Sequence, residues 1–254
     1  MRVLLLLCLP LTATATPLLR SEGVATTANG AVAYREIHWQ QGPAEGAQRL
    51  VQYLCPDGQP FARKEMPATT LAQARGYQLQ DRRSGQQAAV RIAGGLVGID
   101  WKEDRAASPQ VHQVPLPADA VVDAGFDTAV RAHWLGLLKG SPVELPFLVP
   151  GRGKFYPVTV SHQGAVRWQG QSAQSFEVRL STWYGGLAPR LSLVYADADR
   201  RLLEFRGTSN LRDAAGKYPP VVVRFPAPAR EQPAERWGAA LGQPLVARCS
   251  AVAP

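Results

Sequence analysis

Apolar and polar residues alternate with a period of two along most of the chain. The segment 97–102 (VGIDWK) shows the alternation clearly, as do the segments 143–149 and 221–225. This period is typical of a half-buried β-strand. Turn sequences such as Asn29-Gly30 and Pro56-Asp57-Gly58 separate these segments and join them into antiparallel hairpins. We therefore expect about ten or eleven short strands in one meandering sheet.

One segment departs from this pattern, at residues 119–139, where the apolar positions follow a helical period. Asp123 is the expected N-cap, and Gly140 with Pro142 ends the helix. Five residues share one face of the helix: Phe126, Val130, His133, Trp134 and Leu137. A sheet of this size must curl, because strands twist. The predicted fold class is mainly β (α+β): a large curved antiparallel sheet, or open β-barrel, with one central helix on its concave side.

The N-terminal residues indicate export. Arg2 precedes a short apolar run at residues 3–11, and Ala13 and Ala15 fit the small-residue pattern of a cleavage site. We expect a signal peptide over residues 1–15, cut after Ala15, and a periplasmic mature protein. Cys8 raises the alternative of a lipoprotein signal, but a bulky leucine precedes it, which favours soluble export. No later segment is long and apolar enough for a membrane-spanning helix.

Four segments follow from these boundaries. Residues 1–15 are the signal peptide, 16–29 a flexible leader, 30–226 a single open β-barrel domain, and 227–254 a tail rich in proline and alanine. At most a short helix is expected in the tail, near residues 234–241.

The net charge limits the possible partners of the protein. The formal net charge of +8 would suggest nucleic acid in the cytoplasm, but for an exported protein it favours an anionic membrane surface or lipopolysaccharide, with no nucleic acid partner. The basic residues occur in pairs near turns, which is typical of solvated hairpin ends.

Cys55 and Cys249 would remain after cleavage, and export permits a disulfide between them. Two separate thiols are the equal alternative.

No catalytic motif is recognisable. The four histidines lie far apart without zinc-ligand spacing, so no metal, cofactor or catalytic residue is predicted. Asp197 and Asp199 are more typical of a hairpin turn than of paired catalytic carboxylates. His133 is more often a core histidine than a ligand group, and Trp134 more often core than ligand wall. An enzyme is therefore the less favoured class.

Three stretches carry a resemblance to known proteins: YLCPDGQPFARKEM, DAGFDTAVRAHWLGLLKGSPVELPFLVP and LVYADADRRLLEFRGTSNLRDAAG. They resemble a group of uncharacterised exported proteobacterial proteins, over most of the mature chain, and this group implies no activity. More loosely, the plan is similar to the open β-barrels of periplasmic lipoprotein carriers of the Lol type. The resemblance to those carriers implies a curved sheet around helices with acyl chains in the hollow, although no residue motif of the carriers is present.

These observations support three hypotheses. The first is a non-enzymatic envelope protein that binds an apolar or lipid-like ligand, such as an acyl chain, in a half-barrel through Phe126, Val130, His133, Trp134 and Leu137. The second is a structural or interaction module that binds an envelope protein of a periplasmic assembly. The third is an enzyme with an unrecognised site. The sequence predicts no oligomeric state.

Overall fold

The computed structural model describes residues 17–43, 46–180 and 190–250. The expected signal peptide and its cleavage site at Ala15 lie outside these residues. The strands are β1 (Leu18–Thr26), β2 (Val32–Gln41), β3 (Gln48–Leu54), β4 (Pro60–Met66), β5 (Tyr77–Asp81), β6 (Gln87–Ala93), β7 (Leu96–Lys102), β8 (Gln110–Pro115), β9 (Val143–Val149), β10 (Lys154–Trp168), β11 (Gln171–Leu180), β12 (Leu191–Ala196), β13 (Leu202–Thr208), β14 (Pro220–Arg224) and β15 (Arg230–Gln232). The helical segments are η1 (Asp123–Gly125), α1 (Phe126–Ala132), α2 (Trp134–Leu138), η2 (Pro150–Arg152) and α3 (Glu235–Gly242).

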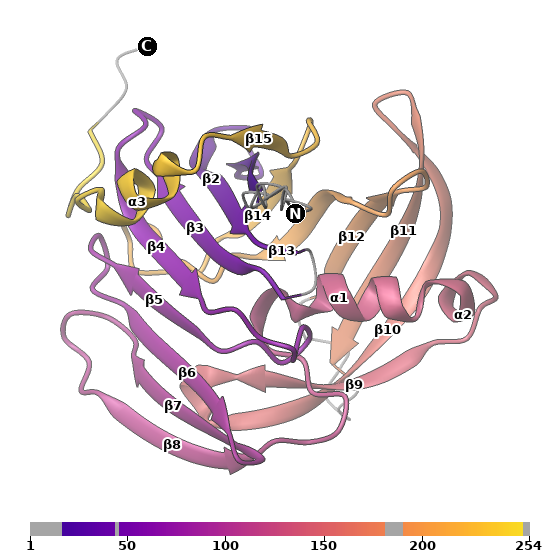
Figure 1. Cartoon of the computed structure of the whole chain (residues 1–254), viewed down its shortest axis with the longest axis horizontal. Coiled ribbons are helices and arrows are strands. Elements are labelled where there is room, and N and C mark those ends of the chain that lie inside the picture. The colour runs from indigo at the N-terminus through magenta and orange to yellow at the C-terminus, as the bar shows by residue number, and fades with distance from the viewer. Residues whose placement is uncertain (1–16, 44–45, 181–189, 251–254) are drawn as a thin grey trace, which may run out of the picture.

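All strands belong to one antiparallel sheet. Its order is β8-β7-β6-β5-β4-β3-β2-β1-β14-β13-β12-β11-β10-β9, and β15 pairs with β1. The sheet therefore consists of two meanders, β1–β8 and β9–β14, that join where β1 pairs with β14. The sheet curls strongly without closing into a barrel (Figure 1). The predicted fold class is confirmed, with fifteen strands among the described residues in place of the expected ten or eleven.

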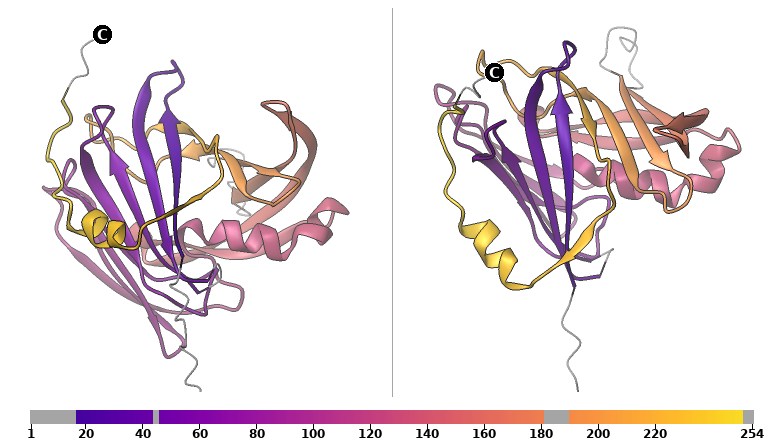
Figure 2. Two further views of the ribbon diagram at one scale, coloured as in Figure 1. Left: turned by 45° about the horizontal axis from the view of Figure 1, so that its top comes forward. Right: turned by 90° about the horizontal axis from the view of Figure 1, so that it is seen from above.

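The helix links the two ends of this sheet. β8 and β9 are the terminal strands of the sheet, and the chain passes from one to the other through η1, α1 and α2. Figures 1 and 2 show α1 and α2 lying end to end across the concave side of β10–β12. The segment before the helix is tied to β9, since the Val121 N–H donates to the carbonyl oxygen of Pro146 at 2.8 Å.

The expectation of a flexible leader over residues 16–29 is wrong, because Leu18–Thr26 form β1 at the centre of the sheet. Apart from Leu18, the buried positions of the strand are small and carry little hydrophobic signal, so the alternation is weak. Ala25 is buried opposite Tyr34, and Gly23 lies against the ring of Phe225, where a Cβ would be only 2.6 Å from a ring carbon. The close approach of that ring explains why this strand has glycine in its interior.

The C-terminal segment also belongs to the domain. β15 pairs antiparallel with the start of β1, and α3, close to the short helix expected near residues 234–241, covers the outer face of β2–β4 (Figure 2). Cys55 and Cys249 form a disulfide with a Cα–Cα distance of 5.4 Å, which ties the end of this segment to the turn after β3. Residues 227–250 are thus a part of the packed structure and not a free tail.

Side chains fill both halves of the curl. In the half formed by β1–β8, inward-facing residues such as Tyr53, Phe61 and Ile99 form one buried cluster. In the other half, the apolar face of α1 and α2 packs on β9–β12 as a second cluster. Within the described residues, no helix is long and apolar enough to cross a membrane.

Candidate functional site

The apolar face of α1 and α2 is buried against the sheet. Phe126, Val130, Trp134 and Leu137 are exposed by 8%, 1%, 4% and 1%, respectively. The Trp134 ring lies 5.2 Å from the ring of Phe176. Four of the five residues expected to bind a ligand therefore belong to a core that fills the concave side of β9–β12 in this conformation.

A buried ion pair fixes where the helix begins. The Lys64 Nζ atom donates to both carboxylate oxygens of Asp123, at 2.6 Å and 2.8 Å. Burial opposes the charged form of Asp123, but the charge and hydrogen bonds of Lys64 outweigh it and lower the pKa of the carboxyl. Asp123 is not the N-cap that the sequence suggested: it lies inside η1 with φ of 51° and no side-chain cap hydrogen bond forms there. Its carboxylate anchors the helix to β4 instead.

The helix is interrupted at His133. This residue has φ −95° and ψ 9° and separates α1 from α2. The backbone ladder nevertheless continues, since the His133 N–H donates to Ala129 and the His133 carbonyl accepts from Leu137. The single helix expected near residues 119–139 is thus three consecutive pieces, η1, α1 and α2, that keep one direction.

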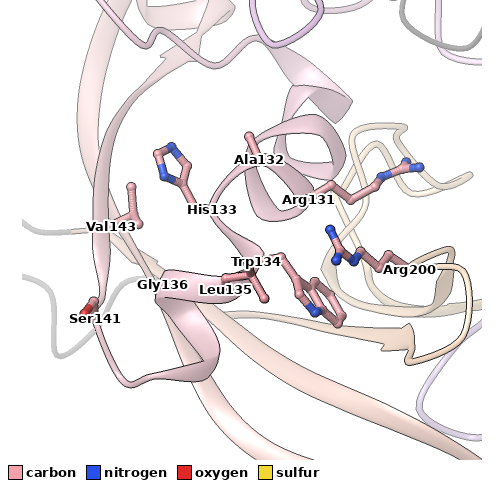
Figure 3. A pocket seen from close by; sticks show the side chains of 9 residues that line it. All are labelled: Arg131, Ala132, His133, Trp134, Leu135, Gly136, Ser141, Val143 and Arg200. Atoms are coloured by element: carbon pink, nitrogen blue, oxygen red, sulfur yellow. The ribbon is translucent and has the colours of Figure 1, made fainter.

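A pocket of about 370 Å³ surrounds this interruption. It lies at the lower end of the volume range of small-molecule sites, about 300–1,000 Å³. Its walls come from the helix, the start of β9 and the turn between β12 and β13: Arg131, Ala132, His133, Trp134, Leu135, Gly136, Ser141, Val143 and Arg200. Figure 3 shows Arg131, Arg200 and Trp134 on one side of the helix and His133 on the other side, toward Val143.

The pocket combines positive charge with an aromatic ring. The guanidinium carbon of Arg200 lies 5.4 Å from the centroid of the Trp134 ring, a cation–π contact. Arg131 pairs with Asp127 one turn earlier, and burial lowers the pKa of its guanidinium, which still stays charged at neutral pH. Among the described residues, Arg200 has no carboxylate partner. An anion at this pocket would meet two guanidinium groups, of which one is free to pair.

Sequence reasoning found part of this pocket. His133 and Trp134 were on the expected face and do line it. Arg131 is not among the five residues of the expected helix face, and Arg200 lies at a turn, where basic residues are typical of solvated hairpin ends. No spacing rule connects Arg200 with the helix, because only the curl of the sheet brings the β12–β13 turn to Trp134.

The remaining histidines have separate partners. The Nε2 atom of His38 lies 2.8 Å from Glu36, and that of His162 lies 2.7 Å from the amide oxygen of Gln174. Over the described ranges, no group of three or more histidine, cysteine, aspartate or glutamate side chains is arranged to hold a metal ion. Asp197–Arg200 form the turn between β12 and β13, where the Arg200 N–H donates to the Ala196 carbonyl at 3.0 Å.

Comparisons with known proteins give a fold and no function. No family model matches the sequence, and no curated protein matches it. A solved β-barrel-like protein of the domain of unknown function DUF1849, from Brucella abortus, aligns with 86% of this chain and 99% of its own chain at a TM-score of 0.51 and 6% identity. A putative outer membrane lipoprotein-sorting protein domain from Vibrio parahaemolyticus aligns with 89% of this chain and 91% of its own at 9% identity, but its TM-score of 0.30 is too low to support an argument. The chain therefore has a β-barrel-like fold, and its function must be argued from the site.

Proposed function

We propose that this protein is exported to the periplasm and binds an anionic, lipid-like ligand at the pocket around His133, without catalysing a reaction. The observation that carries the proposal is that one open pocket is lined both by two arginines, Arg131 and Arg200, and by the apolar side chains of Trp134 and Leu135. Such a pocket suits an amphiphile with an acidic end. Its arginines would bind the acidic group, and its apolar wall would cover part of the chain.

The ligand's two ends are assigned from charge and exposure. Arg200 is the better partner for the acidic group, because Arg131 is already paired with Asp127. Leu135 is 66% exposed, although it is a large apolar residue, and it continues the apolar wall beyond Trp134. We expect the apolar part of the ligand to lie along Trp134 and Leu135.

This arrangement refines the role of the buried helix face. Full burial of an apolar side chain of this size contributes about 1.5–3 kcal/mol. If a ligand displaced Phe126, Val130 and Leu137 from the sheet, the stabilising free energy of all three buried side chains would be lost. We therefore assign these three residues to the support of the pocket wall, and the ligand to the surface that they hold in place.

Two further features support the proposal. The N-terminal sequence has the features of a signal peptide, and the formal net charge of +8 favours anionic partners outside the cytoplasm. Export is tested by the intact mass of the protein after expression in a Gram-negative host. The mass of a chain that begins at Thr16 supports export with cleavage after Ala15. The mass of the uncleaved chain, or of a chain with a lipid on Cys8, contradicts it.

Native mass spectrometry of the gently purified protein tests the binding. We expect an adduct with the mass of an acidic amphiphile on the wild-type protein, and its loss from an Arg131→Gln/Arg200→Gln variant. Arg82→Gln is the matched control, because Arg82 is exposed at the β5–β6 turn and its replacement removes one charge away from the pocket. A protein without any adduct, or one equally loaded in all three forms, would overturn the proposal.

A further inference from the structure

The chain from Arg230 to Cys249, here named the C-terminal strap, crosses the outer face of the sheet. It begins with β15, which pairs with β1, and continues through α3. It then returns to the turn after β3, where the Val246 N–H donates to Pro60 at 2.8 Å and Cys249 is bonded to Cys55. The strap is therefore attached at both of its ends.

A second pocket lies between the strap and the sheet. Its volume is about 390 Å³, and its walls are Arg20, Ile37, Trp39, Gln52, Leu54, Gly58, Gln232, Arg236 and Gln243. It faces away from the curl, because Trp39 belongs to the outer apolar cluster, whereas its neighbour His38 lies against Phe225 on the inner face. This pocket is separated from the pocket around His133 by the sheet itself.

Hydrogen bonds hold the polar wall of this pocket in a fixed arrangement. The Trp39 indole N–H donates to Gln52 at 2.8 Å. The amide nitrogen of Gln52 donates in turn to the Ala240 carbonyl at 3.1 Å and to the side-chain oxygen of Gln243 at 2.9 Å. Trp39, Gln52 and Gln243 are thus ordered before any ligand binds, which reduces the entropy lost on binding.

The polar groups of this pocket that have no hydrogen-bond partner among the described residues are mostly donors. Gln243 accepts through its oxygen, so its amide N–H groups have no internal acceptor among the described residues. Arg236 is exposed and, over the same ranges, has no carboxylate partner, whereas Arg20 pairs with Glu22 at 3.1 Å. Gln232 donates to a backbone carbonyl and keeps its oxygen as an acceptor. The pocket therefore offers guanidinium and amide donors, one amide acceptor and the partly exposed side chain of Leu54. Trp39 and Ile37 are exposed by only 7% and 4%, and the Arg20 guanidinium lies over the Trp39 ring at 5.8 Å.

From this set we infer that the strap pocket binds an acidic sugar. Hydroxyl groups both donate and accept, so they match amide side chains, and the weakly polar face of a sugar ring matches the partly exposed Leu54 side chain. The acidic group pairs with Arg236, the free cation. A plain acyl chain fits this set less well, because it offers the amide and guanidinium groups no hydrogen-bond partner. This inference does not depend on the proposed lipid-like ligand.

Titration with glucuronate, followed by the backbone and indole N–H signals in ¹H–¹⁵N spectra, tests the inference. We expect shifts of the Trp39 indole and Gly58 signals with glucuronate and weaker binding of uncharged glucose. Arg236→Gln should lower the affinity for glucuronate about tenfold, since a hydrogen bond to a charged group is lost. Arg82→Gln, and the Arg131→Gln/Arg200→Gln variant of the other pocket, should leave that affinity unchanged.

The same chemistry occurs in free glycans and in glycolipid headgroups, and vesicles distinguish the two. Phosphatidylcholine vesicles with and without a glucuronosyl diacylglycerol provide the second arm. Binding of free glucuronate alone assigns the pocket to a soluble glycan, and additional Arg236-dependent binding to the glycolipid vesicles assigns it to a headgroup. Absence of binding in both arms, or binding that Arg236→Gln does not weaken, would overturn the inference.

Discussion

Replacing Asp123 by asparagine should destabilise the protein by about 3–5 kcal/mol, the usual loss when one partner of a buried ion pair is removed. Lys64 is only 5% exposed, so its charge would remain buried without a counter-ion. Asparagine is the right probe, because it tolerates the positive φ of 51° at this position and keeps the size of the side chain. The loss therefore reports the charge and not the backbone.

The pKa shifts of Asp123 and Lys64 determine how the contribution of this ion pair to the free energy of unfolding depends on pH. The pKa of Asp123 is lowered below its ordinary value of 3.8, so its contribution is complete above that value and is lost as the pH falls through the folded pKa. Burial opposes the charge of Lys64, but Asp123 outweighs it and raises the pKa above 10.5. The contribution of Lys64 is accordingly complete below pH 10.5 and is lost as the pH rises through the folded pKa.

Urea denaturation at neutral pH, with the disulfide intact, measures the free energy of unfolding of the wild type, Asp123→Asn, Lys64→Met and the double variant. We expect the double variant to recover much of the loss, because it leaves no unpaired charge. The reasoning is refuted if Asp123→Asn costs less than about 1 kcal/mol, the value typical of an exposed pair, or if the two single losses simply add.

Two other predictions concern the same framework. Replacing Cys55 and Cys249 by serine should lower the free energy of unfolding by about 4–5 kcal/mol, because the bond closes a loop across 194 positions; denaturation of the wild type with and without reductant should reproduce the difference, and an equal stability would contradict it. Gly23→Ala should cost about 1–3 kcal/mol, because its Cβ would meet the Phe225 ring. Gly98→Ala is its control, since that position is open, and thermal melts that shift equally for both glycine variants would argue against the close approach.

The sequence predicted the elements that have a strong period. Alternation gave the hairpins on both sides of the helix, and the helical period selected the face that is in fact buried. Gly140, with φ of 84°, follows α2 by two residues, so the expected helix end is close to the observed one. These features are local, and so a single chain is enough to recognise them.

The missed elements lack such a local signal. In β1, Ser21, Gly23 and Ala25 are small and weaken the apolar alternation, and β8 is mostly exposed and ends at Pro115. Their strand conformation follows from pairing with other strands, which propensity cannot report. The sequence likewise carries no signal for the break of the helix at His133, because histidine is not by itself a helix breaker.

The candidate site could be predicted only in part, for the same reason. Trp134 and His133 were identified because they lie on the helix. Arg200 reaches the pocket through the curl of the sheet, and the strap pocket depends on the path of the C-terminal segment across the outer face. Contacts between segments so far apart in the chain require the three-dimensional structure.

The central claim, that Arg131 and Arg200 select an acidic amphiphile, is tested most directly by calorimetric titration with laurate and with 1-dodecanol, which has the same chain length but no charge. We expect laurate to bind the wild type at least about tenfold more tightly than the alcohol, and this preference to disappear in the Arg131→Gln/Arg200→Gln variant and to persist in Arg82→Gln. Equal affinities for the two amphiphiles, or a preference that survives the loss of both arginines, would contradict the claim.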